Sequence, residues 1–343
     1  MTGTWWEYMA IFLASGILCV VSTPYLMRMA YSRGFLDQPG GHKSHDEAVP
    51  FLGGVAIVLA FALAVLVVSL LNPPHSGPGE ILGLFAVAVM LSIIGLLDDL
   101  RNVSPTVRVL AEAGAAVVIW LMGSGVAVSG VGFVDLSLTI FWVVGITNAF
   151  NLLDNMDGLA AGLATVSSLT IFAVAASNGQ FLVAGLAVGL AGCTVGFLRH
   201  NRFPARVYMG DGGALFIGFL VSVLAIKLRF DGGRTVSALV PVLACSVAVF
   251  DTTLVTLSRL HSGLSPFLGG QDHVSHRLVK LGLPVPYAVG SIHVGAVGIG
   301  ILTFVSSGTD PWSAWIIAGM IGLTYLAAGI VLLRVPVDRL EAG

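Results

Sequence analysis

The sequence predicts an all-α integral membrane protein that crosses the bilayer many times. Of its 343 residues, 56% are hydrophobic and 10% are charged, whereas charged residues make up roughly a quarter of a typical soluble domain. Apolar runs of about 20 residues, the length at which a helix spans a bilayer, recur along the whole chain. This composition excludes a soluble globular fold. The formal net charge of −2 carries no information about partners.

Eleven apolar runs are predicted to be transmembrane helices. No Lys or Arg precedes Arg28, and the first run is too long for the apolar part of a signal peptide, so we expect this helix to be retained. Trp5, Trp6 and Tyr8 at its start are typical of an aromatic anchor at the membrane surface. The predicted spans, in chain order, are 5–27, 51–72, 80–97, 107–126, 138–153, 159–177, 181–198, 212–228, 236–257, 286–306 and 311–333.

The basic residues predict the orientation of these spans. Three of the 16, Lys227, Arg229 and Arg234, lie on one side, and thirteen lie on the other. The positive-inside rule makes the side with thirteen cytoplasmic, so the N-terminus is expected outside and the C-terminus in the cytoplasm. The thirteen are Arg28, Arg33, Lys43, Arg101, Arg108, Arg199, Arg202, Arg206, Arg259, Arg277, Lys280, Arg334 and Arg339.

Carboxylates gather on the same predicted cytoplasmic side. Nine of the thirteen aspartates fall there, while the external connections, such as "NPPHSGPG" and "SNGQ", are short and lack motifs. This pattern is typical of a membrane enzyme with a cytosolic substrate, and it predicts a single transmembrane catalytic domain over residues 1–343 with its active site on the cytoplasmic face. An ion-coupled transporter, the alternative from another class, would set ionisable groups near the bilayer midplane and show symmetry between its halves.

Two of the polar stretches precede the fourth span. "DQPGGHKSHDEAVPFLGG" (37–54) is a turn-rich loop with Lys43 and His45 at its centre, and its alternative interpretation is an ordinary solvated loop. In "GLLDDLRNVSPTVRVLAEA" (95–113), Asp98 and Asp99 end one span and Arg108 begins the next. The alternatives are ordinary polarity at a helix end and pairing of Arg108 with the residue four positions on, Glu112.

A third stretch, "NAFNLLDNMDGLA" (148–160), concentrates polarity in an otherwise apolar region. On a helix, Asn148, Asn151 and Asn155 would fall within about 60° of one another, with Asp154 and Asp157 at the edge of this stripe. Amide and carboxylate oxygens suit Mg²⁺ and hydrogen bonds to a polar substrate. Amides that only join helices within the membrane are the alternative.

The last two stretches add a carboxylate and a group of cations. In "RHNRFPARVYMGDGGALFIG" (199–218), Asp211 lies among glycines at the start of a span, where it could hold a metal bridged to phosphate. In "SRLHSGLSPFLGGQDHVSHRLVKLG" (258–282), His273, His276 and Arg277 would share one helix face. They favour a cationic grip on phosphates, because a zinc site would need a further ligand at closed spacing.

Together, hard oxygen ligands and phosphate-binding cations predict Mg²⁺ and a pyrophosphate or nucleotide substrate. A lipid is the expected second substrate, since it explains why the site is placed in a bilayer. We expect no nucleic-acid partner.

Several of these stretches, in this order and spacing, resemble one family, the polyprenyl-phosphate N-acetylhexosamine-1-phosphate transferases (glycosyltransferase family 4). They are "GLLDDLRNVSPTVR", "NAFNLLDNMDGLAAG", "VYMGDGGALFIGF", "FDTTLVTLSRL" and "GGQDHVSHRLVKLG". The resemblance runs from about residue 34 to residue 282, and "DQPGGHKSHDEAVPFLGG" is similar to the first cytoplasmic loop of the family. Eleven spans and a compact last loop are most similar to the enzymes that load N-acetylglucosamine-1-phosphate onto undecaprenyl phosphate. The phospho-MurNAc-pentapeptide transferases typically have ten spans and a run of three histidines.

The resemblance implies roles for the site residues. Asp98 and Asp99 match a catalytic acidic pair near the lipid phosphate, and Asn151 and Asp211 match the residues that bind Mg²⁺, which Mn²⁺ could replace. The residues that match substrate-binding positions are Lys43, His45, Arg108, Asn148, Asp154, Asn155, Asp157, His273, His276 and Arg277.

Four positions depart from the family pattern. Arg108 stands where Lys is common, Asn155 where Gly is usual, Ser275 where His is usual, and His42 where Arg often precedes the lysine. Asn155 and Ser275 could therefore mark a different sugar preference.

The activity implied is transfer of a sugar-1-phosphate, with N-acetylglucosamine expected, from a UDP-sugar to undecaprenyl or another polyprenyl phosphate in a bacterial cell membrane. The lipid phosphate would attack the β-phosphorus and UMP would leave, which starts a cell-envelope glycan. Another UDP-N-acetylhexosamine or UDP-MurNAc-pentapeptide, a homodimer, and a non-catalytic scaffold of the same shape are left open.

Overall fold

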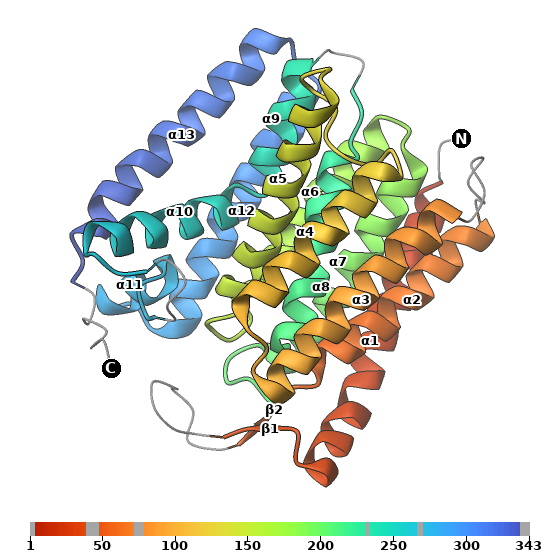
Figure 1. Cartoon of the computed structure of the whole chain (residues 1–343), viewed down its shortest axis with the longest axis vertical. Helices are drawn as coiled ribbons and strands as arrows, with labels where there is room; N and C mark the ends of the chain where they lie inside the picture. Colours follow the sequence, from red (N-terminus) through yellow and green to blue (C-terminus); the bar gives the residue numbers. More distant parts are fainter. Residues whose placement is uncertain (1–3, 39–47, 72–78, 231–233, 266–269, 337–343) are drawn as a thin grey trace.

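The computed structural model describes residues 4–38, 48–71, 79–230, 234–265 and 270–336. Within these ranges the chain is helical apart from loops and one two-residue antiparallel pair, β1 (Leu36–Asp37) and β2 (Val49–Pro50) (Figure 1). The helices are α1 (Trp5–Arg33), α2 (Gly53–Leu71), α3 (Gly79–Arg101), α4 (Pro105–Leu121), α5 (Gly132–Leu153), α6 (Leu159–Ser177), α7 (Phe181–Asn201), α8 (Gly210–Ile226), α9 (Arg234–Ala244), α10 (Ser246–His261), α11 (Val274–Lys280), α12 (Val285–Ser307) and α13 (Pro311–Leu333).

The protein is an all-α polytopic membrane protein. In the part of the chain that the structure describes, eight helices are long and apolar enough to cross a membrane: α1, α2, α3, α5, α6, α7, α12 and α13. α4 and α8 have 17 residues each, fewer than the roughly 20 that a span needs. Ten of the eleven predicted spans each fall on one helix, and the span 236–257 falls on two, α9 and α10. The count of eleven and the orientation stay predictions.

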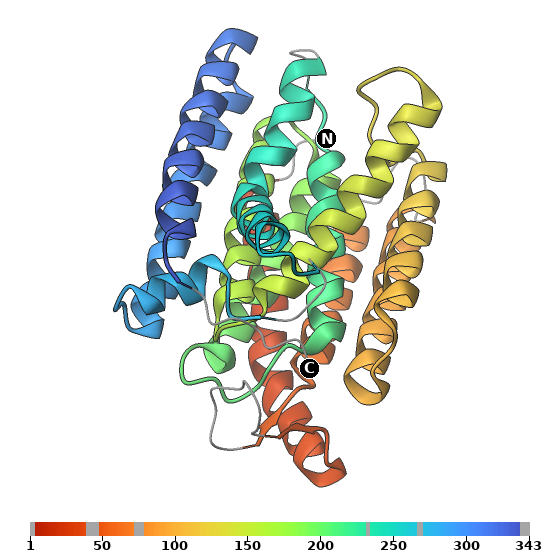
Figure 2. The ribbon, with the colours of Figure 1, turned by 60° about the vertical axis from the view of Figure 1, so that its left-hand side comes forward.

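One predicted span was wrong in form. Residues 236–257 were expected to be one helix, but α9 and α10 meet at an angle of 74°. The backbone leaves helical geometry at Cys245 (φ −107°, ψ 9°). As a result α10 runs across the long axis of the molecule, and Figure 2 views it nearly along its own axis. Hydropathy misses such a break because both halves are apolar and only the direction of the chain changes.

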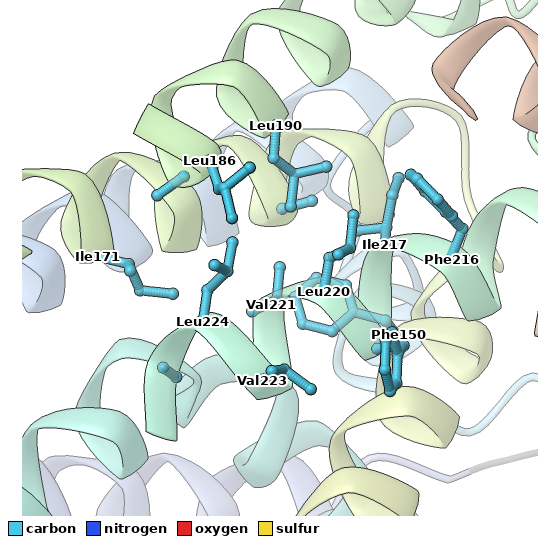
Figure 3. Packing of buried hydrophobic residues seen from close by; sticks show 14 of the residues in the cluster. Phe150, Ile171, Leu186, Leu190, Phe216, Ile217, Leu220, Val221, Val223 and Leu224 are labelled. Carbon is cyan, nitrogen blue, oxygen red and sulfur yellow. The ribbon is translucent and has the colours of Figure 1, made fainter. Parts of the chain in front are cut away.

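The core is centred on α8. Every residue from Gly212 to Ile226 is buried, as expected for a helix that is apolar on all sides. Figure 3 shows the packing around it: Phe216, Ile217, Leu220, Val221 and Leu224 of α8 lie with Phe150 of α5, Ile171 of α6, and Leu186 and Leu190 of α7.

α8 is fixed against α3 at both ends. Near the start of α8, a Cβ atom placed on Gly95 of α3 would lie 2.5 Å from the backbone carbonyl of Asp211, so the two backbones touch where Gly95 has no side chain. At the other end, Lys227 forms an ion pair with Glu80 and donates a hydrogen bond to Ser124 Oγ over 2.9 Å. These contacts set how far α8 can slide along α3.

Substitution of Gly95 by Ala is expected to lower the free energy of unfolding by about 1–3 kcal/mol, because the new methyl group must push α8 away. Gly145→Ala on α5 is the matched control, since a Cβ atom there meets nothing within 4 Å. The control should be neutral or slightly stabilising, as Ala is a better helix former than Gly. Thermal unfolding in detergent measures both, and equal melting temperatures would contradict the close contact.

Several predicted site elements lie at one end of the bundle. α3 and α5 end there, α8 begins there, and β1, β2 and α11 lie at the same end (Figure 1). α12 and α13 form one flank of the molecule, and α3 and α4 form the opposite flank (Figure 2).

Candidate active site

Arg108, in the first turns of α4, joins two carboxylates from two other helices. Its Nη1 donates to Asp98 Oδ2 of α3 over 2.5 Å and to Asp211 Oδ2 of α8 over 2.8 Å. Asp98 is buried, whereas the Asp211 side chain is 31% exposed and thus open to a ligand. The alternative pairing of Arg108 with Glu112 is not formed, because Glu112 accepts a hydrogen bond from Asn148 of α5 instead.

Asp99, unlike Asp98, contacts the backbone of α8 rather than Arg108. Its carboxylate accepts hydrogen bonds from the backbone N–H groups of Asp211 (3.0 Å) and Gly212 (3.4 Å) in the first turn of α8. A carboxylate at this end of a helix satisfies free N–H groups and is stabilised by the helix dipole. This contact makes Asp99 a positioning residue for Asp211, and its predicted catalytic role stays a prediction.

The three asparagines of residues 148–160 do not form a single stripe. α5 ends at Leu153, so Asn155 lies beyond the helix, where it accepts a hydrogen bond from Ser275 Oγ of α11 over 2.8 Å. Asn148 faces α4, and the Asn151 amide has no hydrogen bond to the described residues. The prediction assumed that the helix continued to residue 155, and that was wrong.

Negative charge accumulates beside these asparagines. The half-buried Asp154 has a pKa raised to about 7, first by burial and then by the charges of Asp99 and Asp157. Burial, followed by the charges of Asp157, Asp37 and Asp154, raises the pKa of Tyr208 to about 12. Asp157 itself accepts a hydrogen bond from the backbone N–H of Ala205 over 2.8 Å. A cation or a hydrogen-bond donor is therefore favoured beside Asp154.

Asp154→Asn is expected to raise the melting temperature in EDTA, with a gain that grows as the pH rises from about 4 to about 7. The folded pKa of about 7 exceeds the ordinary 3.8, so in this window the unfolded chain has lost a proton that the folded chain keeps. Stability is thus lost as the pH rises through the folded pKa, and an uncharged Asn avoids this loss. Thermal unfolding at about pH 5 and about pH 8 measures it. An equal gain at both pH values would contradict the assignment.

Asp251 and Arg259 of α10 hold the start of α11. Asp251 accepts hydrogen bonds from His273 Nδ1 (2.7 Å) and from the backbone N–H of Val274 (2.7 Å), at the start of α11. The buried Arg259 grips Asp272 through two bonds of 2.8 and 2.6 Å. His273, predicted to bind substrate, is thus 3% exposed and already engaged by Asp251.

Arg277 is buried, and its guanidinium donates to protein groups. It donates to the carbonyl oxygens of Asp272 (2.8 Å), Leu332 (2.8 Å) and Val335 (3.2 Å) and to Ser258 Oγ (2.8 Å). With an exposed fraction of 1%, it joins α10, α11 and the end of α13. A buried guanidinium that is already bonded to the protein does not fit the predicted contact with a phosphate. The sequence pattern indicated which helix face carries Arg277, but it could not indicate that α13 packs on that face.

His276 is the member of the predicted basic group that keeps an open hydrogen-bonding atom. Its Nδ1 is buried and has no hydrogen-bond partner within the described residues. Burial, and then the charge of His273, lowers the pKa of His276 to about 4. In the free protein His276 is therefore neutral at pH 7 and can donate or accept a hydrogen bond, rather than act as the expected cation.

Two predicted substrate-binding residues, Lys43 and His45, lie outside the described residues. The sequence-based prediction also missed Asn201, at the end of α7. It is 2% exposed, accepts a hydrogen bond from Gly158 N–H (3.1 Å) and donates to the carbonyl of Val207 (3.0 Å). It thereby ties the start of α6 to the connection before α8. A lone amide at the end of an apolar run was the available signal.

The oxygen ligands fit a Mg²⁺ ion that takes further ligands from phosphates. Within the described ranges, no three His, Cys, Asp or Glu residues are grouped to hold a metal by themselves. Asp211 is partly exposed, the Asn151 amide has no hydrogen bond to the described residues, and Asp154 has a pKa raised partly by its neighbours' charges. Mg²⁺ prefers such oxygen ligands and commonly uses one or two carboxylates beside substrate phosphates. Its presence stays a prediction.

The fold and this cluster define a polytopic membrane protein with acidic residues bridged by an arginine at one end of its helices. The chain belongs to glycosyl transferase family 4, whose model matches residues 81–229. The matched region includes Asp98, Arg108 and Asp211 and thus confirms the resemblance drawn from the motifs.

Relatives of known description cover most of the chain. A Bacillus subtilis (strain 168) protein described as a probable undecaprenyl-phosphate N-acetylglucosaminyl 1-phosphate transferase is 32% identical over 79% of this chain and 77% of its own length. A decaprenyl-phosphate N-acetylglucosaminephosphotransferase of Mycolicibacterium smegmatis is 29% identical over 97% and 89%. The undecaprenyl-phosphate alpha-N-acetylglucosaminyl 1-phosphate transferase of Escherichia coli (strain K12) is 26% identical over 84% and 82%. None of the three is described as a transporter, the alternative that the sequence left open.

Proposed function

We propose that the protein transfers N-acetylglucosamine-1-phosphate from UDP-N-acetylglucosamine to undecaprenyl phosphate, or to another polyprenyl phosphate, and releases UMP. The observation that carries the proposal is the cluster of Asp98, Arg108 and Asp211, which lies at the end of membrane helices. The descriptions of the relatives support the sugar and the lipid carrier. A bacterial cell membrane is the proposed location.

The reaction joins two anions, so its main requirement is neutralisation of charge and alignment of the phosphates. An oxygen of the lipid phosphate forms a bond to the β-phosphorus of the UDP-sugar, while the bond from that phosphorus to the oxygen of UMP breaks. A phosphate monoester, with a second pKa of about 6, is largely ionised at pH 7, so a strong base is not required. Asp98 would orient the lipid phosphate or accept its residual proton.

The other residues bind and align. Arg108 bonds both carboxylates and would offer its remaining N–H groups to phosphate oxygens. Asp211 and Asn151 are the proposed ligands of Mg²⁺, which would neutralise phosphate charge when bound. Asp154, Asn155, Asp157 and His276 are proposed to face the nucleotide and the sugar, together with Lys43 and His45.

The full-length protein, purified in detergent, tests this with undecaprenyl phosphate and radiolabelled UDP-N-acetylglucosamine, UDP-N-acetylgalactosamine and UDP-MurNAc-pentapeptide in separate reactions. Labelled lipid and UMP are expected with UDP-N-acetylglucosamine. EDTA should abolish transfer, and Mg²⁺ or Mn²⁺ should restore it, because the ligands are hard oxygens. Release of UDP, or full turnover in EDTA, would contradict the proposal.

The reaction is also expected to run in reverse. Labelled UMP, added with the lipid product, should enter the UDP-sugar, since one phosphoanhydride replaces another. An active preparation that shows no such exchange would exclude direct transfer of the sugar-1-phosphate.

A further inference from the structure

A groove of about 840 Å³ opens between α1, α7 and α12. Its walls are apolar: Phe12 and Ile17 come from α1, Val195 from α7, and Val289 and Gly290 from α12. Its volume lies in the roughly 300–1,000 Å³ range of small-molecule sites. None of its lining residues belongs to α3, α4 or α8, which carry Asp98, Arg108 and Asp211.

Where α1 and α7 meet, the groove is lined by Gly16, Gly192 and Gly196, and the two helices pack closely at these small residues. A Cβ atom on Gly192 would lie 2.3 Å from Ser15 Oγ and 2.4 Å from the carbonyl oxygen of Phe12. One on Gly196 would lie 2.4 Å from the carbonyl oxygen of Gly16. These two helices therefore meet backbone to backbone beside the groove.

One end of the groove is basic. Arg199, in the last turn of α7, and Arg202, the residue that caps this helix, line it, and both side chains are exposed. Neither forms an ion pair with another described residue. Asp157, which is also proposed to face the nucleotide, lines this end as well, so the groove borders the candidate active site there; its carboxylate accepts the hydrogen bond from Ala205. Two exposed guanidinium groups that have no ion pair within the described part of the chain thus line one end of an apolar groove.

We propose that this groove binds one anionic phospholipid of the surrounding bilayer. An acyl chain of the lipid would lie against the apolar walls, and its phosphate would bind Arg199 and Arg202. Apolar walls would accept any acyl chain, whereas arginines between membrane helices select a negative headgroup. The reacting lipid phosphate must instead reach Asp98 and Arg108, which do not line the groove. A resident phospholipid therefore fits better than the polyprenyl carrier.

Native mass spectrometry of the purified full-length protein tests the proposal. Phosphatidylglycerol and phosphatidylcholine with identical acyl chains are added in equal amounts, and bound lipids are counted. Wild-type protein is expected to prefer phosphatidylglycerol by a factor on the order of ten. The Arg199→Gln, Arg202→Gln double variant should lose this preference. Arg206→Gln, an exposed arginine of the same connection outside the groove, should keep it.

A second variant tests the apolar part. A Cβ atom on Gly290 meets nothing within 4 Å, so Gly290→Leu should fill the groove without strain and remove the bound lipid. Undecaprenyl phosphate, added in excess, should leave phosphatidylglycerol in place. The proposal is overturned if the double variant keeps its preference, if Gly290→Leu binds as much lipid as the wild type, or if undecaprenyl phosphate displaces the phospholipid. The measurement is of binding, so it stands whether or not the protein proves to be a transferase.

Discussion

Asp211→Asn is expected to reduce sugar-1-phosphate transfer by roughly a hundredfold or more, with a deficit that excess Mg²⁺ only partly restores. An amide keeps one oxygen ligand but loses the charge that a Mg²⁺ ion and Arg108 both use. The partly exposed Asp211 side chain lies at the first turn of α8, so the neutral isostere should not unfold the protein. Turnover is measured across a Mg²⁺ titration, with a thermal melt of the same preparation.

Asp98→Asn is the matched comparison, because Arg108 contacts both carboxylates. If Asp98 only orients the lipid phosphate, its variant should be slower without a change in the Mg²⁺ concentration for half-maximal activity. A shift of that midpoint for Asp98→Asn, with none for Asp211→Asn, would show that the two roles are assigned the wrong way round.

Arg277→Leu is expected to lower the free energy of unfolding by about 3 kcal/mol or more, because it leaves the carbonyl groups of Leu332 and Asp272 without their buried donor. Loss of turnover should therefore be accompanied by a lower melting temperature. His276→Gln is the matched control on the same helix: it should reduce turnover and leave the melting temperature unchanged.

The two variants separate a structural from a substrate-binding role for Arg277. If Arg277→Leu melts like the wild type but raises the KM for the UDP-sugar, Arg277 contacts the phosphates as the sequence predicted. If it melts early, and the loss of turnover follows the unfolded fraction, Arg277 holds α11 against α13.

The sequence predicted the long helices well because the length of an apolar run can be read directly from the sequence. The spans predicted at 159–177 and 311–333 coincide with α6 and α13 to the residue. A change in the direction of the helix axis within an apolar run leaves no such signal, so the turn at Cys245 between α9 and α10 was missed. The close approach at Gly95 was missed as well, since its reason lies in a residue more than a hundred positions away.

In the candidate site, too, the sequence identified residues but not their contacts. Residue type and motif position identified Asp98, Arg108 and Asp211, and the structure brings these three together. Their partners could not be predicted, because each contact depends on how separate helices pack. Thus Arg108 bonds the carboxylates of Asp98 and Asp211 rather than Glu112. The buried Arg277 donates a hydrogen bond to the backbone carbonyl of Leu332 in α13.

The ion pair between Lys227 and Glu80 has a consequence for mutational mapping. α8 rises about 1.5 Å per residue, so Lys227 lies roughly 24 Å along it from Asp211. A shift of α8 by one residue in its register on α3 would move Asp211 by about 1.5 Å relative to Asp98, enough to cost activity. Loss of Lys227 could permit such a shift. A scan scored only by turnover would then count Lys227 among the active-site residues, although it lies at the opposite end of the helix.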